Sequence, residues 1–358
     1  MQQTAVTIIL PTYQEFDSLP SLIKAVDEVR ISSLPNLQLI IVDDNSDDGT
    51  EKLIADMNNE WVTLMIRTED RGLSPAVIAG LTVATSEFCV VMDADGSHPA
   101  SAIPDMVKAL QGGADFVVGS RYIGGGTTED GWGVLRWLNS KIATLMARPF
   151  TKVLDPMSGF LAFRHATFKA ARNLNPVGYK IGLELIVKCD CKNVTEVPIH
   201  FRTRQLGESK LTLSVQWQYL QHIIRLLRYT QPSLVSFVTF ATVGLSGLGV
   251  YVLASILTTS FITPFWIANI VAILIAMTWN FLWDRRFAFW DAHKRPFLIQ
   301  YIGFVLICSV GAIPNALITN WIAATETVPL AALLGGLVGA TVGIIFNFLM
   351  NRMLVFRK

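Results

Sequence analysis

Two aspartates one residue apart, Asp93 and Asp95, follow the apolar run Val90-Val91-Met92 and precede Gly96 and Pro99. An apolar run bounded by Gly and Pro is typical of a buried parallel strand, and ligands gather beyond the carboxyl ends of such strands. In an extended segment residues i and i+2 share a face, so both carboxylates can bind one hard cation such as Mg²⁺ or Mn²⁺. Asp and Gly are also ordinary turn residues, so the pair alone fits either a metal site or a solvated turn.

The elements that must position this pair are strands and helices in alternation. Helical periodicity predicts helices at 19–29, 76–84 and 103–110, which fall between strand-length apolar runs. These runs, the expected strands, are residues 6–10, 37–42, 62–66, 88–92 and 116–118. The alternation predicts a doubly wound, Rossmann-like α/β domain.

Polar residues follow the first two expected strands, at 11–15 and 43–50. A β-α-β unit with such strand ends is typical of a nucleotide site, and no G-x-G-x-x-G follows the first strand, which argues against a dinucleotide. The carboxylates after the second strand suit hydrogen bonds to a base or ribose, because they accept from N–H and O–H donors. A capped helix start at 46–50 fits the same residues.

The composition divides the chain. Of its 358 residues 51% are hydrophobic and 16% charged, which is too apolar for a purely soluble protein. Charges recur up to about Tyr229, whereas residues 234–350 contain long stretches with almost none. We therefore expect a soluble domain at 1–230 and a membrane domain at 231–358. The formal net charge of +1 gives no sign of a nucleic-acid partner.

Four segments in the second half are long enough to cross a hydrocarbon core of about 30 Å. They are residues 234–259, 265–283, 297–319 and 329–350. Lys and Arg are concentrated in the loop 284–295 and in the C-terminal tail. By the positive-inside rule both termini and the soluble domain are expected on the cytoplasmic side of a cell (inner) membrane.

Two further segments, 134–150 and 215–229, carry apolar residues on one helical side and aromatic and basic residues around the edge. This pattern predicts amphipathic helices at the bilayer surface, while a core-packed helix face is the alternative. The membrane domain also contains an internal repeat, because N-F-L-x-x-R-x-x-x-F occurs at 280–289 and again at 347–356. It predicts two related hairpins.

Several motifs occur in a fixed order along the soluble domain: P-T-Y-Q-E at 11–15, V-D-D-N-S-D-D-G-T at 42–50, R-G-L-S at 71–74, M-D-A-D-G at 92–96, G-S-R-Y at 119–122, D-P-M-S-G-F at 155–160, G-Y-K-I-G-L-E at 178–184 and R-Q-L-G-E-S-K at 204–210. Together they resemble the family 2 glycosyltransferases of the GT-A fold, and most closely the dolichyl-phosphate mannose synthases. The resemblance covers roughly residues 5–230. The membrane half resembles GtrA-like four-helix domains.

The resemblance implies roles for individual residues. The residues that would contact the base and ribose are Pro11, Tyr13, Glu15, Val42 and Asp44. Further contacts to the nucleotide sugar would come from Asp93, Ala94, Asp95 and Lys180. Asp93 and Asp95 hold Mg²⁺ or Mn²⁺ on the diphosphate and count, with Arg121, as catalytic. The third metal ligand in the family is commonly Gln, where this chain has Ser97, so that Asp93 and Asp95 must carry more of the coordination.

The resemblance also implies the reaction. The acceptor is a polyprenyl (dolichyl-type) monophosphate, which is already a dianionic nucleophile at neutral pH and needs no general base. The expected phosphate-binding residues are Arg121, Arg136, Ser140, Arg204 and Lys210. Arg136 and Ser140 fall at i and i+4 of one helix, so both can reach a single phosphate.

Attack opposite the leaving group inverts the anomeric centre, and GDP-mannose is the preferred donor. UDP-glucose is the alternative donor, and a non-catalytic transporter of lipid-linked sugars is a second alternative. The membrane half is expected to anchor the enzyme in the bilayer, to associate protomers into a homo-oligomer, or to move the product.

Overall fold

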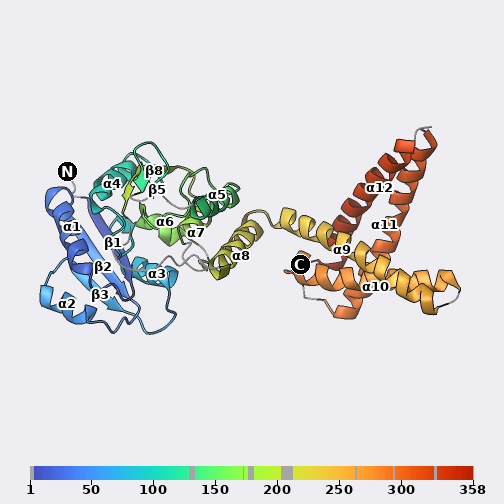
Figure 1. Cartoon of the computed structure of the whole chain (residues 1–358), viewed down its shortest axis with the longest axis horizontal. Helices are drawn as coiled ribbons and strands as arrows, with labels where there is room; N and C mark the ends of the chain where they lie inside the picture. Colours follow the sequence, from blue (N-terminus) through green and yellow to red (C-terminus); the bar gives the residue numbers. More distant parts are fainter. Residues whose placement is uncertain are drawn as a thin grey trace. The chain divides into compact units, whose positions relative to one another are not determined.

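The computed structural model describes residues 4–128, 134–171, 173–175, 181–202, 213–262, 264–292, 295–325 and 329–357. The chain divides into two compact units, Met1–Leu226 and Leu227–Lys358 (Figure 1). The first is a mixed α/β unit and the second, in its described part, is helical.

A seven-stranded sheet forms the centre of the described part of the first unit, in the order β3-β2-β1-β4-β7-β5-β8. All its strands run parallel except β7, which is antiparallel to both β4 and β5. The strands are β1 (Ala5–Thr12), β2 (Asn36–Asp43), β3 (Val62–Ile66), β4 (Phe88–Val91), β5 (Phe116–Ser120), β7 (Leu161–Arg164) and β8 (Val194–Pro198). A separate parallel pair joins β6 (Thr127–Thr128) to β9 (His200–Phe201).

The sheet confirms the five expected strands and brings their carboxyl ends to one edge. Pro11 lies beside Val42 in the β1–β2 register, and Ile9 lies beside Val91 in the β1–β4 register. The chain order reverses at β1, which lies between β2 and β4, and such a switch point opens a crevice for a ligand. The antiparallel strand β7 was not predicted, and its amino end places the 155–160 motif at the same edge.

Helices cover both faces of the sheet, as a doubly wound fold requires (Figure 1). One core contains side chains of α1 (Leu19–Ser32), α2 (Thr50–Met57) and α4 (Ile103–Gln111). The other contains side chains of α3 (Leu73–Val83), α6 (His165–Ala170) and α7 (Ile181–Lys188). The remaining long helices, α5 (Val134–Ala147) and α8 (Leu213–Thr230), overlap the two segments expected at the bilayer surface, although α5 ends three residues earlier than predicted.

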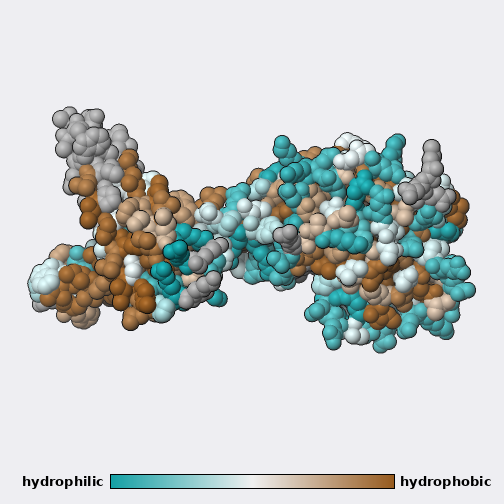
Figure 2. Space-filling view, turned by 180° about the vertical axis from the view of Figure 1, so that it is seen from behind, coloured by the Kyte–Doolittle hydropathy of each residue, from teal (hydrophilic) through white to brown (hydrophobic). Residues whose placement is uncertain are grey.

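The described part of the second unit contains α9 (Pro232–Phe261), α10 (Phe265–Trp283), α11 (Phe297–Thr325) and α12 (Pro329–Met350). Three described stretches are long and apolar enough to cross a membrane, namely Pro232–Phe261, Phe265–Ala288 and Val338–Val355, and Phe297–Gly311 is a shorter apolar segment. Figure 2 shows the hydrophobic surface that these helices expose. The expectation of four spans stays a prediction.

The repeat predicted from N-F-L-x-x-R-x-x-x-F is visible in the contacts of the second unit. A π-helix of residues Asp284–Ala288 follows α10, and a second π-helix, Asn351–Val355, follows α12. Phe289 and Phe356, which end the two copies of the motif, stack with their ring centroids 4.3 Å apart. The first residue of each motif, an asparagine, packs on a glycine of the preceding helix: Asn280 on Gly247 and Asn347 on Gly311.

Candidate active site

Asp93 and Asp95 stand directly beyond the carboxyl end of β4, where the sequence places them. The Oδ1 atom of Asp95 accepts hydrogen bonds from the Ser97 backbone N–H at 3.0 Å and from the Ser97 hydroxyl at 2.5 Å. The Ala94 carbonyl between them accepts a bond of 2.7 Å from the Ser18 hydroxyl. Ser97 is fully buried, and its two hydrogen bonds orient the Asp95 carboxylate.

The Asp93 carboxylate rests against Gly159 of the 155–160 motif. A Cβ atom at position 159 would lie 3.1 Å from each of the two carboxylate oxygens of Asp93. Any larger side chain would press on this carboxylate, because 3.1 Å is shorter than an ordinary van der Waals contact. Glycine therefore leaves the space in which the carboxylate lies.

His98 lies behind this pair and is 3% exposed. Its Nδ1 accepts a hydrogen bond of 3.0 Å from the Asp93 backbone N–H, and its Nε2 lies 4.0 Å from Asp93 Oδ2. Burial lowers the pKa of His98, although the charges of Asp93 and Asp95 oppose this shift. The imidazole is therefore neutral at pH 7, with its proton on Nε2.

Arg121, which follows β5, is held by a fully buried carboxylate from the 155–160 motif. Its Nε donates to Asp155 Oδ2 at 2.7 Å and its Nη2 donates to Asp155 Oδ1 at 2.8 Å. Burial opposes the charge on the guanidinium, but the bonds to Asp155 outweigh it and raise the pKa of Arg121. Glu196 in turn accepts from the Asp155 backbone N–H at 3.1 Å. This cation is thereby fixed near Asp93.

The residues expected to contact the base and ribose gather at the ends of β1 and β2. The Tyr13 side chain is 49% exposed, whereas the Val42 side chain lies in the core. The Asp44 carboxylate is engaged within the protein, because it accepts from Arg67 Nη1 and from the Gly72 backbone N–H, both at 2.6 Å. Pro11 ends in register with Val42, and Glu15 begins the turn into α1 through its carbonyl oxygen.

Ser140, expected at the acceptor phosphate, lies on α5 with its hydroxyl 2.7 Å from the Tyr122 hydroxyl. The Lys141 ammonium lies 5.4 Å from the centre of the Tyr122 ring, and the Arg121 guanidinium lies 5.5 Å from it. Tyr219 of α8 donates to the Ala143 carbonyl at 2.7 Å. Tyr122 thus links the end of β5 to α5, and Tyr219 links α5 to α8.

Four expected site residues have no described side chain. Lys180, Arg204 and Lys210 lie outside the described residues, and Arg136 belongs to a part of α5 where only the backbone is described. The structure therefore brings together Asp93, Asp95 and Arg121, and it places Ser140 beside Tyr122.

Three residues of this site were not assigned roles from the sequence: His98, Tyr122 and Asp155. Tyr122 belongs to the motif that supplied Arg121, and His98 closely follows the motif that supplied Asp93 and Asp95. Asp155 begins the 155–160 motif, from which no residue was assigned. Their roles depend on partners that lie 5, 18 and 34 positions away in the chain.

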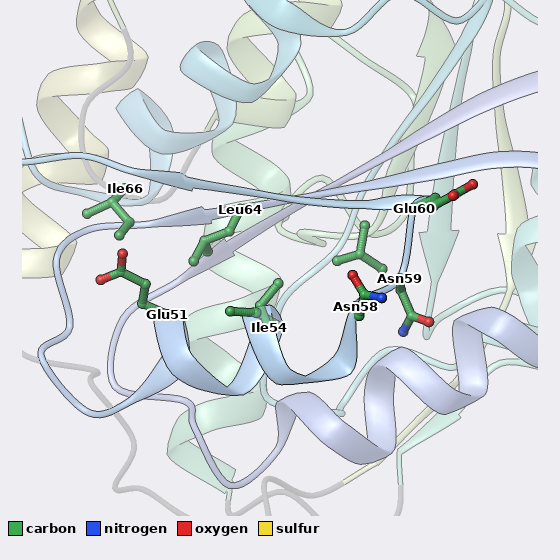
Figure 3. A pocket seen from close by; sticks show the side chains of 9 residues that line it. Glu51, Ile54, Asn58, Asn59, Glu60, Leu64 and Ile66 are labelled. Carbon is green, nitrogen blue, oxygen red and sulfur yellow. The ribbon is translucent and has the colours of Figure 1, made fainter.

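A cavity of about 410 Å³ opens elsewhere in the unit, between α2 and the edge strand β3. Figure 3 shows its lining, which includes Glu51, Ile54, Asn58 and Leu64. None of the residues expected in the active site lines it. The candidate site lies at the carboxyl ends of β1 and β4, where Asp93 and Asp95 follow β4.

The oxygens around Asp93 and Asp95 suit a divalent cation. Within the described ranges, no three His, Cys, Asp or Glu side chains cluster as a metal site. Two carboxylates are nevertheless enough for Mg²⁺, which usually keeps several waters and completes its shell with substrate phosphates. The space that Gly159 leaves beside Asp93 is consistent with this use.

Sequence comparisons agree with this geometry. A family model for glycosyl transferase family 2 matches residues 7–171, and a model for the GtrA/DPMS transmembrane domain matches residues 239–356. The chain is 34% identical to a dolichol-phosphate mannosyltransferase of Pyrococcus furiosus over 97% of its length and 98% of that protein. It is 38% identical to a protein of the same name in Mycosarcoma maydis, over 62% of the chain and 79% of that protein.

A polyprenol monophosphomannose synthase of Mycolicibacterium smegmatis is 33% identical over 57% of the chain and 80% of that protein. Among solved structures, a glucosyl-3-phosphoglycerate synthase from Mycobacterium tuberculosis aligns with a TM-score of 0.47 at 19% identity, over 63% of this chain and 78% of that one.

The sheet order and the paired carboxylates beyond β4 are those of a GT-A glycosyltransferase. The chain belongs to the family 2 glycosyltransferases, within the dolichol-phosphate mannosyltransferase group, and is a membrane-bound mannosyltransferase. The resemblance stated from the motifs is therefore confirmed.

Proposed function

We propose that this enzyme transfers mannose from GDP-mannose to a polyprenyl phosphate with inversion, at the cytoplasmic face of the membrane. The observation that carries the proposal is the 34% identity, over 97% of the chain, to a relative named dolichol-phosphate mannosyltransferase. The pair Asp93 and Asp95 at the switch point of the sheet supports it, because nucleotides bind at such crevices.

The donor enters across the ends of β1 and β2. Tyr13, which is half exposed, offers its ring face to the base, while Pro11 and Glu15 line the same strand end. Asp44 is proposed to contact the nucleotide with a carboxylate whose position is fixed, because Arg67 and the Gly72 backbone N–H both bond it. Ala94 and Lys180 complete the proposed contacts to the nucleotide sugar.

Asp93 and Asp95 would hold Mg²⁺ or Mn²⁺, with Ser97 as the third position that the family pattern implies. The cation, when bound, stabilises negative charge on the departing nucleoside diphosphate. The Ser97 hydroxyl supports Asp95 by donating to its Oδ1. In the loaded site the two aspartates would supply the protein oxygens that hold the cation.

The acceptor phosphate lies on the opposite side of the sugar, near Arg121 and Ser140. Two anions must approach each other for transfer, and fixed cations lower the repulsion between them. Arg121 suits this role because Asp155 holds its planar fork in one orientation. Arg136, Arg204 and Lys210 are proposed to add charge. The phosphate is its own nucleophile, so no residue is assigned as general base.

The second unit holds the enzyme in a cell (inner) membrane. Lys and Arg in the loop 284–295 and in the C-terminal tail support cytoplasmic termini by the positive-inside rule. We propose four spans within 231–358, with the region 1–230 on the cytoplasmic side. Association of protomers through this unit is part of the same proposal.

A donor assay tests the proposed function. Membranes containing the full chain are incubated with polyprenyl phosphate and either labelled GDP-mannose or labelled UDP-glucose, and the organic extract is separated by thin-layer chromatography. We expect labelled lipid from GDP-mannose, with a β linkage, and none after EDTA treatment or in Asp95→Ala. Label from UDP-glucose alone would overturn the mannose donor, and product made by Asp95→Ala would overturn the metal site.

A further inference from the structure

We propose that His98 is a positioning residue that fixes Asp93 for the cation and the diphosphate. The inference rests on the proposed function, because it assigns a support to the same site. His98 touches neither the nucleotide nor the acceptor in this assignment and acts through Asp93.

His98 forms a hydrogen bond with the backbone of Asp93. The Nδ1 atom accepts the Asp93 N–H at 3.0 Å, which sets the direction in which the chain leaves β4. The Nε2 atom lies 4.0 Å from Asp93 Oδ2. The ring therefore holds the backbone of Asp93 and lies beside its carboxylate.

Two aromatic side chains hold the His98 ring. It stacks on Phe160 with centroids 5.0 Å apart and an interplanar angle of 15°, and it meets Phe201 edge-on at 5.6 Å. The neighbouring Ser97 carbonyl accepts from the Arg202 backbone N–H at 3.1 Å. The segment after β4 is thus joined to the start of β7 and to β9 through His98 and its neighbour.

His165 provides a matched control. It is also a buried histidine of the first unit, its Nε2 bonds the Leu81 carbonyl at 2.9 Å, and it stacks on Phe168 with centroids 6.1 Å apart. It lies on α6 beyond the other end of β7 and makes none of the contacts described for the aspartate pair. A loss of packing alone is therefore reproduced by His165→Leu.

The experiment measures Mn²⁺ binding to the full-length protein in detergent, with GDP present, by electron paramagnetic resonance. We expect His98→Leu to weaken Mn²⁺ binding about 10- to 100-fold, the usual effect of removing a group that orients a metal ligand. His98→Asn, which keeps an acceptor for the Asp93 N–H, is expected to fall between His98→Leu and the wild type. His165→Leu should melt earlier and bind Mn²⁺ like the wild type.

Wild-type affinity in both His98→Leu and His98→Asn would overturn the inference, and so would an equal loss in His165→Leu. Where His98→Leu does not fold, as judged by circular dichroism, wild-type affinity in His98→Asn and in His98→Gln overturns it. The formation of mannolipid by the wild type tests the proposed function separately from Mn²⁺ binding. A wild type that makes no mannolipid, together with weakened Mn²⁺ binding in the His98 variants, contradicts the donor and acceptor but supports the positioning role.

Discussion

The Arg121 guanidinium and the Asp155 carboxylate form a two-point ion pair in which Asp155 is fully buried. The pair joins the end of β5 to the motif that precedes β7, across 34 positions of the sequence. The pair fixes the Arg121 guanidinium near Asp93. It also gives the buried Asp155 carboxylate its compensating positive charge.

Replacing Arg121 with alanine leaves Asp155 buried without its main partner. Such a change is expected to lower the free energy of unfolding by about 3–5 kcal/mol. Chemical denaturation of the full chain in detergent, followed by tryptophan fluorescence, measures it. Adding Asp155→Asn to Arg121→Ala should recover part of the loss, because the uncompensated charge is gone. Additive losses in the double variant would show that the two residues do not act as a pair.

Ser97→Ala tests whether this serine supports Asp95. Removing the hydroxyl takes away the 2.5 Å bond to Asp95 Oδ1 but keeps the backbone bond. We expect Mn²⁺ affinity to fall about 10-fold, as for other groups that orient a metal ligand, with a nearly unchanged kcat at saturating Mn²⁺. Asp95→Asn should lose activity at every Mn²⁺ concentration. If Ser97→Ala behaved like Asp95→Asn, the serine would be a ligand itself.

Gly159→Ala tests the space beside Asp93. The new methyl group would lie 3.1 Å from both carboxylate oxygens, so the carboxylate must turn away. The concentration of Mn²⁺ that gives half-maximal transfer is expected to rise about 10-fold. Gly124→Ala is the control, because a Cβ at that position meets no atom within 4 Å. An equal effect of both substitutions would contradict the role given to Gly159.

The membrane unit offers a test of its repeat. A methyl group at Gly247 would overlap the Asn280 amide. Gly247→Ala is therefore expected to lower the free energy of unfolding by about 1–3 kcal/mol, the usual cost of overpacking, and to lower the melting temperature in detergent. Gly244→Ala on the same helix is the control, since its Cβ would meet nothing within 4 Å.

Combining Gly247→Ala with Asn280→Ala removes the overlap and should restore part of the lost stability. The same pattern is expected at Gly311 and Asn347, which occupy the second copy. A loss at only one of the two glycines would argue that the hairpins are not equivalent.

The sequence by itself determined the parts that depend on local pattern. Apolar runs ending at polar residues predicted β1, β2 and β4 and placed Asp93 beyond a buried strand, which the sheet confirms. Such strands can be recognised from the sequence, because burial on both faces of the sheet requires continuous apolar residues. The ordered motifs gave the family. The motif repeated at 280–289 and 347–356 predicted two related hairpins, and both copies contain a π-helix and place their asparagine on a glycine of the preceding helix.

Only the tertiary structure decided which side chains meet. The run at β7 looks like any other short strand, and its antiparallel place between β4 and β5 follows from long-range pairing. The partners of His98 and Arg121 come from segments far apart in the chain, so no local periodicity encodes them. Charge, hydropathy and spacing therefore specified the aspartate pair, while packing across elements specified what holds that pair in position.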